Sequence, residues 1–306
     1  MQTLLRTFLI ALSLVVGTAA FAGDVEDGNA ALARNDYATA LKNFKNAAAR
    51  NDFYAQLQVG NIYNEGLGVS QDYAEAVRWY KLAAAQGEAM AQFNLGNMYI
   101  NAQGVVQDYA EAVRWYKLAA AQGHASAQYN LGQMYLGGEG VVQDYAEAAH
   151  WYKLAAAQGQ REAQSNLGVM YRRGQGVVQD YVEAVRWYKL AAAQGEAMAQ
   201  YNLGQMYRGG QAVVQDYAEA FRWYKLAAAQ GHADAQSNLG FLHSRGYGVV
   251  QDYVRAHMWM NLAAVKGDAD AVKNRDIVAA KMTTQQIAEA QKMARECQSR
   301  NFKRCD

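Results

Sequence analysis

The sequence predicts an all-α protein, a solenoid of stacked antiparallel helix pairs. The nine residues WYKLAAAQG occur five times, first at 79–87, and an altered copy, WMNLAAVKG, covers 259–267, always with a step of 36 residues. Each 36-residue unit contains two segments with the apolar spacing of three and four that marks a helix. A constant step of this size is typical of stacked repeats, in which each unit buries an apolar face against its neighbours.

The first 22 residues predict an export signal. Arg6 supplies the positive start, FLIALSLVV at 8–16 the apolar stretch, and Ala20-Phe21-Ala22 a cleavage site before Gly23. The apolar run is short for a membrane span, and no cysteine that could carry a lipid follows the cleavage site. We therefore expect an exported protein with no integral membrane segment after cleavage. An uncleaved N-terminal anchor is the alternative.

Residues 23–52 predict a degenerate repeat that caps the array. Asp36 lies 36 residues before Asp72, but Asn43 takes the position of the tryptophan and Phe44 that of the following tyrosine. At the other end, residues 268–306 leave the pattern and predict a helical cap and tail. There, Thr283 and Gln286 form a capping-box pattern at the start of a last helix near 284–297.

Six full repeats are predicted between these caps, over residues 53–267. In the unit 88–123, Asp108 precedes the second helix and Glu111 follows three residues later, an aspartate version of the capping box. Gly123 follows the last turn of that helix, where a left-handed residue is favoured. The second helix carries two apolar stripes, so it must be covered both by its own partner and by another repeat.

A glycine also stands inside each first helix, where it costs about 1 kcal/mol relative to alanine. We expect it to admit the tryptophan or tyrosine of the second helix at close range; a flexible kink is the alternative. The residues predicted to build this framework include the glycines Gly96, Gly132, Gly168 and Gly204 and the tryptophans Trp79, Trp115, Trp151, Trp187, Trp223 and Trp259.

The stretches AQYNLGQMY (127–135 and 199–207), GVVQDYAEAVRWY (104–116) and WYKLAAAQG resemble the Sel-1-like repeat (SLR) family, the 36-residue relatives of tetratricopeptide repeats. The resemblance covers roughly residues 52–267. It implies a right-handed superhelix with a concave inner face. It also implies adaptor work, in which the repeats hold partners together or present a binding groove. Exported bacterial members are linked to envelope function or host contact.

The first helix and the loop after it differ between repeats, whereas the second helix is nearly constant. First helices typically line the concave surface in such solenoids, so the variable positions predict a ligand groove. Its arginines favour an acidic peptide, a C-terminal carboxylate or an anionic glycan. Ordinary solvated charge is the alternative. The groove candidates are Tyr129, Gln133, Arg172, Arg173, Tyr201, Gln205, Arg208 and Arg245.

The sequence contains little that predicts chemistry. It has no H-x-x-x-H pair, no G-x-S-x-G motif, no glycine-rich phosphate loop and no cysteine within the repeats. We therefore predict no catalytic residue, no metal ligand and no cofactor. A balance of 29 Lys+Arg against 28 Asp+Glu gives no support for a nucleic-acid partner. Cys297 and Cys305 could form a disulfide in an oxidising compartment; two idle thiols are the alternative.

The predicted function is that of a non-catalytic scaffold. The expected location is the periplasm, and secretion is the alternative. It would bind a protein or peptide partner, from the envelope or a host, in the groove. One alternative is a hydrolase of the β-lactamase type, as credited to cysteine-rich relatives of this repeat family. Those relatives carry a cysteine pair in each repeat, which this chain lacks. The other alternative is a secreted effector that acts on host cells.

Overall fold

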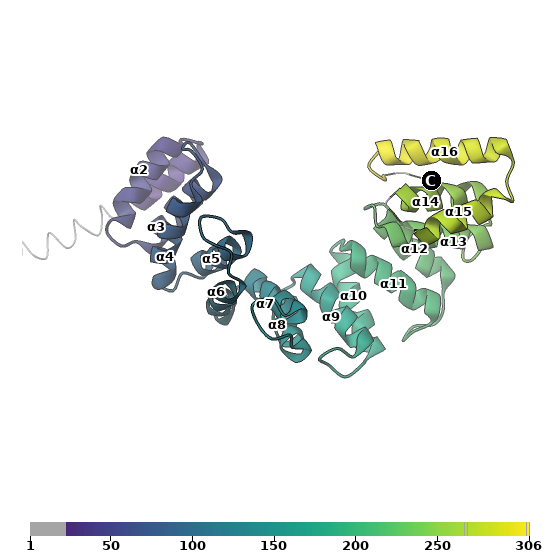
Figure 1. Cartoon of the computed structure of the whole chain (residues 1–306), viewed down its shortest axis with the longest axis horizontal. Coiled ribbons are helices and arrows are strands. Elements are labelled where there is room, and N and C mark those ends of the chain that lie inside the picture. The colour runs from purple at the N-terminus through teal and green to yellow at the C-terminus, as the bar shows by residue number, and fades with distance from the viewer. Residues whose placement is uncertain (1–22, 266, 268, 304, 306) are drawn as a thin grey trace, which may run out of the picture. The chain divides into compact units, whose positions relative to one another are not determined.

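The computed structural model describes residues 23–265, 267, 269–303 and 305, so the predicted export signal at 1–22 lies outside the described residues. Every regular element within these ranges is an α-helix (Figure 1). The all-α repeat array predicted from the 36-residue step is therefore confirmed.

Each repeat contributes a first and a second helix, joined by a short loop. A helix over residues 23–33 precedes α2 (Tyr37–Ala48). The repeats then supply the pairs α3 (Phe53–Glu65) and α4 (Tyr73–Ala85), α5 (Ala89–Asn101) and α6 (Tyr109–Ala121), α7 (Ala125–Gly137) and α8 (Tyr145–Ala157), α9 (Arg161–Arg173) and α10 (Tyr181–Ala193), α11 (Ala197–Gly209) and α12 (Tyr217–Ala228), and α13 (Ala233–Arg245) and α14 (Tyr253–Val265). The chain ends with α15 (Ala269–Ala279) and α16 (Thr284–Ser299).

The helices form two compact units, Met1–Asp144 and Tyr145–Asp306. Within the first unit, one core cluster joins α3 and α4 to α5 through Leu57, Tyr80 and Leu95, which are 6%, 1% and 0% exposed. Within the second unit, an equivalent cluster joins α10 to α11 through Tyr188 and Leu203, both fully buried. Each interface between repeats is thus a small core of its own, as expected for a solenoid.

The second helices begin at aspartate caps, but the capping box is only half formed. Oδ1 of Asp108 accepts a hydrogen bond from the Glu111 N–H at 2.9 Å, as predicted. The predicted reciprocal bond, from the Asp108 N–H to the Glu111 side chain, is wrong. The Asp108 N–H donates instead to the carbonyl of Tyr99 in the preceding helix, at 3.1 Å. This bond satisfies a carbonyl near the end of α5 that has no partner in its own helix. The cap therefore also closes the loop within the repeat.

The loss of the glutamate in the last repeat does not abolish its cap. Asp252 still accepts the backbone N–H of Arg255 at 2.9 Å, and the Arg255 guanidinium donates to the second carboxylate oxygen at 2.6 Å. At the other end of the second helices, Gly87 and Gly123 have φ values of 90° and 86°. These are the left-handed residues that the sequence predicts at that place.

Adjacent aromatic residues of the second helix serve different interfaces. Tyr116 lies against Gly96 of its own repeat. Its neighbour Trp115 packs against the preceding cluster, which contains Tyr80. Trp79 and Trp223 likewise pack against the core cluster that precedes the one containing the adjacent tyrosine. The tyrosine, and not the tryptophan, therefore fills the space left by the glycine, while the tryptophan holds successive repeats together.

The C-terminal cap matches the sequence pattern. Thr283 and Gln286 form both halves of a capping box at the start of α16. Cys297 and Cys305 form a disulfide, and both are buried. Cys297 joins the cluster that contains Trp259, and α16 packs against α14 (Figure 1). The alternative of two idle thiols does not hold in this structure.

Candidate ligand-binding site

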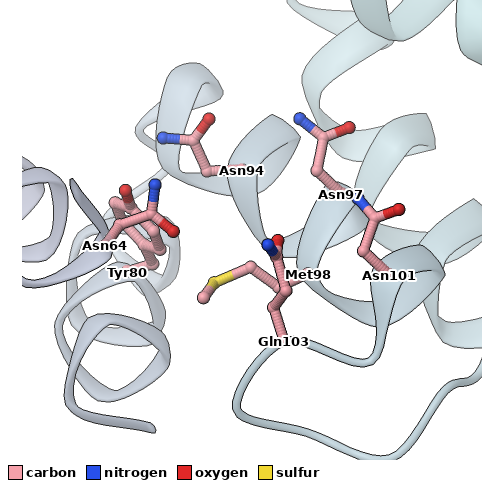
Figure 2. Close-up of a pocket in the computed structure, with 7 residues that line it drawn as sticks. All are labelled: Asn64, Tyr80, Asn94, Asn97, Met98, Asn101 and Gln103. Carbon is pink, nitrogen blue, oxygen red and sulfur yellow. The ribbon is translucent and has the colours of Figure 1, made fainter. Parts of the chain in front are cut away.

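A pocket of about 220 Å³ lies in the first unit, between the first and the second full repeat (Figure 2). One side is formed by Asn64 at the end of α3 and Tyr80 of α4. The α5 helix and the loop after it form the other side, so the pocket spans the junction of two repeats. We call it the amide pocket, because its lining consists of Asn64, Tyr80, Asn94, Asn97, Met98, Asn101 and Gln103.

Two buried tyrosines hold the polar floor of this region in place. The Tyr80 hydroxyl donates to Oδ1 of Asn61 at 2.8 Å, and Tyr116 donates to Oδ1 of Asn97 at 2.6 Å. Nδ2 of Asn94 also reaches Oδ1 of Asn61, at 3.5 Å. Burial raises the pKa of Tyr116 to about 12 and that of Tyr80 further, so both phenols are neutral donors near neutral pH. The amides are thereby fixed in orientation.

The chemistry of the amide pocket is neutral and two-sided. Each asparagine or glutamine side chain offers an oxygen that accepts and a nitrogen that donates two hydrogen bonds. Peptide groups and sugar hydroxyls have the same double character. Within the described ranges, no group of three or more His, Cys, Asp or Glu side chains is arranged to hold a metal ion. The arrangement can therefore bind and orient a ligand through neutral hydrogen bonds. The lining residues of the amide pocket include no carboxylate, histidine, serine or cysteine.

Three of the sequence-predicted groove residues lie together in the second unit. Tyr201 accepts a hydrogen bond from Nε2 of Gln205 at 2.6 Å, and Oε1 of Gln205 accepts from the Tyr224 hydroxyl at 3.0 Å. The Arg208 guanidinium donates to Oδ1 of Asn238, in the first helix of the next repeat, at 2.9 Å. The Tyr201–Gln205–Tyr224 bonds lie within one repeat, and only the Arg208–Asn238 bond crosses to the next. The charge of Arg208 also acts on the Tyr224 phenol.

The remaining groove candidates are placed in different ways. Arg172 is half-buried at the end of α9, and the charge of its guanidinium acts on the Tyr188 phenol. Arg173 and Arg245 are exposed. On α7, Tyr129 is half-buried and Gln133 exposed. The arginines thus differ in environment: Arg208 bonds to the next repeat, whereas Arg172 lies near Tyr188 of its own repeat.

The repeat pattern itself is matched by a family model. The Sel1 repeat model matches six consecutive segments, 53–88, 89–124, 125–160, 161–196, 197–232 and 233–268. The chain belongs to the Sel1 repeat family. These segments begin at the first helix of each pair and end just after the glycine that follows the second helix.

Solved structures of other Sel1 repeat proteins are similar to this one. A Sel1 repeat protein from Oxalobacter formigenes is 32% identical, with a TM-score of 0.69, over 78% of this chain and 96% of that one. The protein c5321, described as a protective antigen of uropathogenic Escherichia coli with an SLR fold, is 27% identical, with a TM-score of 0.51, over 94% of this chain and 86% of its own. A search of curated proteins found no match.

The sequence missed part of the amide pocket of this Sel1 repeat protein. The groove candidates include equivalents of Asn97 (Gln133 and Gln205), of Asn64 (Arg172 and Arg208) and of Asn101 (Arg173 and Arg245) in other repeats, but no residue of the pocket itself. A signal was available, because asparagine is a poor helix former and five of them stand in or at the end of α3 and α5. Such residues in regular helices need another reason to be there, and hydrogen bonding at a repeat junction provides one.

Proposed function

We propose that this Sel1 repeat protein is a non-catalytic scaffold that binds a protein or peptide partner along its first helices. The observation that carries the proposal is the lining of the amide pocket. Asn64, Asn97 and Asn101 occupy positions that differ between repeats, while the framework around them is repeated almost unchanged. A constant skeleton with variable side chains at one set of positions is the arrangement expected of a binding surface.

The partner's chemistry follows from the lining. An amide-rich, neutral pocket pairs well with the main chain of an extended peptide, whose N–H and C=O groups alternate. The exposed face of the second helices is nearly the same in every repeat: it carries exposed leucines such as Leu82 and ion pairs such as Arg78–Glu75, which contribute only a few tenths of a kcal/mol. Specific contacts are therefore expected on the first helices.

We further propose that the protein works outside the cytoplasm, in the periplasm or beyond. The Cys297–Cys305 disulfide is typical of an oxidising compartment. The related c5321 protein is described as a protective antigen, which is consistent with exposure at or beyond the cell envelope. Within the described ranges, no helix is both long and apolar enough to cross a membrane. Mass spectrometry of the native protein should find Gly23 at its N-terminus, in the periplasmic or culture fraction.

Site-specific photo-crosslinking tests the binding function. A photoreactive residue at position 101, inside the amide pocket, should capture a defined partner in living cells, and the same residue at position 118, on the exposed face of α6, should not. The double variant Asn64→Ala/Asn97→Ala should reduce capture at position 101 without changing the circular dichroism spectrum. Equal capture from both positions, or none from position 101, would contradict the proposal.

A further inference from the structure

Four buried polar atoms at one junction of the second unit make no hydrogen bond of normal geometry. They are Ser165 Oγ, Arg172 Nε, Tyr188 OH and Asn202 Nδ2. Ser165, Tyr188 and Asn202 are at most 4% exposed, and Arg172 is half-buried. We call this set the donor cluster. Leaving such groups without hydrogen bonds in a protein interior destabilises the fold, so the cluster requires an explanation.

The equivalent place in the first unit shows what is missing. There, Oδ1 of Asn61 accepts from the Tyr80 hydroxyl at 2.8 Å and from Nδ2 of Asn94 at 3.5 Å. The positions 108 residues later are Val169, Tyr188 and Asn202. Val169 has replaced the amide that would accept both hydrogen bonds. The two donors remain, and the acceptor between them has been lost.

Two further substitutions change the same place. Tyr201 fills the equivalent position in the next repeat, where its ring lies 5.9 Å from that of Tyr224. Ser165 stands there instead and removes the bulk of an aromatic ring. Arg172 occupies the position of Asn64, and its side chain lies within hydrogen-bonding reach of the Tyr188 phenol, on which the charges of Arg172 and Arg173 both act. The junction therefore combines a smaller side chain, positive charge and donors without acceptors.

In the next repeat, the equivalent tyrosine and arginine both have hydrogen-bond acceptors within the protein. There, Tyr224 donates to Gln205, and Arg208 donates to Asn238. Turning over the amide of Asn202 would offer one oxygen to the Tyr188 phenol, whose own oxygen the Arg172 side chain approaches, but Ser165 Oγ and Arg172 Nε would still lack an acceptor. A single water molecule has only two lone pairs, whereas a carboxylate accepts about four hydrogen bonds.

We infer that the donor cluster binds one carboxylate group of a partner protein, which supplies the acceptors that Val169 withholds. The uncharged donors Tyr188, Asn202 and Ser165 would form charge-assisted hydrogen bonds to the two oxygens, and the Arg172 guanidinium would add one in which both partners are charged. The carboxylate belongs either to the C-terminus of the partner or to an aspartate or glutamate side chain. The inference deepens the proposed function and rests on it only in assigning the carboxylate to a partner chain.

Peptide titration of the full chain tests the inference, with the NMR signal of the Arg172 Nε–H group as the readout. The signal is identified by its loss in Arg172→Lys. The probes are N-acetyl-trialanine with a free carboxylate, the same peptide with a C-terminal amide, and N-acetyl-Ala-Asp-Ala amide. We expect a saturable shift with at least one carboxylate peptide and none with the neutral peptide. The tighter of the two carboxylate probes identifies its source.

A restored acceptor provides the decisive variant. Val169→Asn recreates the amide found at position 97, so binding should weaken about tenfold, the effect of one charge-assisted hydrogen bond. Val178→Asn makes the same exchange at a loop position that is 88% exposed and should leave binding unchanged. Saturable binding of the neutral peptide, no saturable shift with either carboxylate, or full binding by Val169→Asn would overturn the inference.

Failure here and failure of the scaffold function are distinguishable. Photo-crosslinking at position 101 reports on the amide pocket in the first unit, far along the sequence from Val169. If the crosslink forms and the carboxylate probes do not bind, the scaffold proposal stands and the donor cluster has no carboxylate ligand.

Discussion

Cε1 of Tyr116 lies 2.4 Å from the point at which a β-carbon on Gly96 would stand. The same relation joins Gly168 to Tyr188, at 2.6 Å, and Gly204 to Tyr224, at 2.5 Å. Non-bonded carbon atoms do not approach this closely. The missing side chain of the glycine is therefore what allows the second helix to bury its tyrosine against the first.

Gly96→Ala should destabilise the protein, although alanine is the better helix former. We expect a loss of about 1–3 kcal/mol from overpacking, because the backbone or the Tyr116 ring must move. Urea unfolding monitored by circular dichroism measures it. Gly137→Ala is the matched control: a β-carbon there meets nothing nearer than 3.6 Å, so the change should be neutral or slightly stabilising. A stabilising Gly96→Ala would exclude the close-packing explanation.

Removal of a tyrosine hydroxyl should have opposite effects in two repeats. Tyr116→Phe loses the hydrogen bond to Asn97 and should cost about 1 kcal/mol. Tyr188→Phe removes a buried hydroxyl that lies near Arg172 but makes no hydrogen bond of normal geometry, so the ligand-free protein should become equally or more stable. Unfolding free energies of the two variants, measured without added carboxylate, provide the comparison. A similar loss in both would mean that the Tyr188 hydroxyl is satisfied in solution.

Stability should fall as the pH drops below the ordinary histidine pKa of 6.5. Burial lowers the pKa of His124, whose Nδ1 accepts the Ala127 N–H at 3.2 Å and whose ring stacks on Phe93. A group with a lowered folded pKa stabilises the fold fully above its unfolded value and loses that contribution as the pH falls. Melting temperatures between pH 8 and pH 5 test this.

His124→Gln is the control for the pH effect. Gln160 caps the equivalent helix α9 through its side-chain oxygen, so glutamine can replace the cap without titrating. The variant should melt with a weaker pH dependence over this range. A residual slope is expected from His257, whose pKa burial also lowers. An unchanged slope would exclude His124 as a contributor.

Reduction of the disulfide should loosen the C-terminal cap and leave the distant repeats folded. The bridge between Cys297 and Cys305 closes a loop of eight positions, which is expected to contribute about 2–3 kcal/mol to the stability of that segment. Hydrogen exchange of α16 should accelerate after addition of a reductant, while α5 and α6 should keep their protection, because contacts in a solenoid link neighbours only. Uniform acceleration along the chain would contradict this expectation.

The sequence by itself determined the architecture. The 36-residue step, the aspartates that begin the second helices and the glycines that end them are local signals, since caps and left-handed turns depend on residues within a few positions. They predicted the helix pairs. Thr283 and Gln286 predicted the capping box of α16 in the same local way. The glycine inside each first helix predicted close packing, because the loss of helix stability that it causes recurs in every repeat and therefore needs a structural reason.

Only the tertiary structure decided which side chains meet. Trp115 and Tyr116 are adjacent in the sequence and apolar alike, yet one packs on the preceding core and the other on its own glycine. The sequence also did not predict the role of the buried Gln92. Its Nε2 donates to the Ala84 carbonyl of the preceding repeat at 3.3 Å, and its oxygen accepts from Gln122 at 2.9 Å. Likewise, the loss of one acceptor at Val169 becomes visible only when Tyr188 and Asn202 lie beside it. Contacts between repeats depend on side-chain direction in three dimensions, and a one-dimensional period does not contain that information.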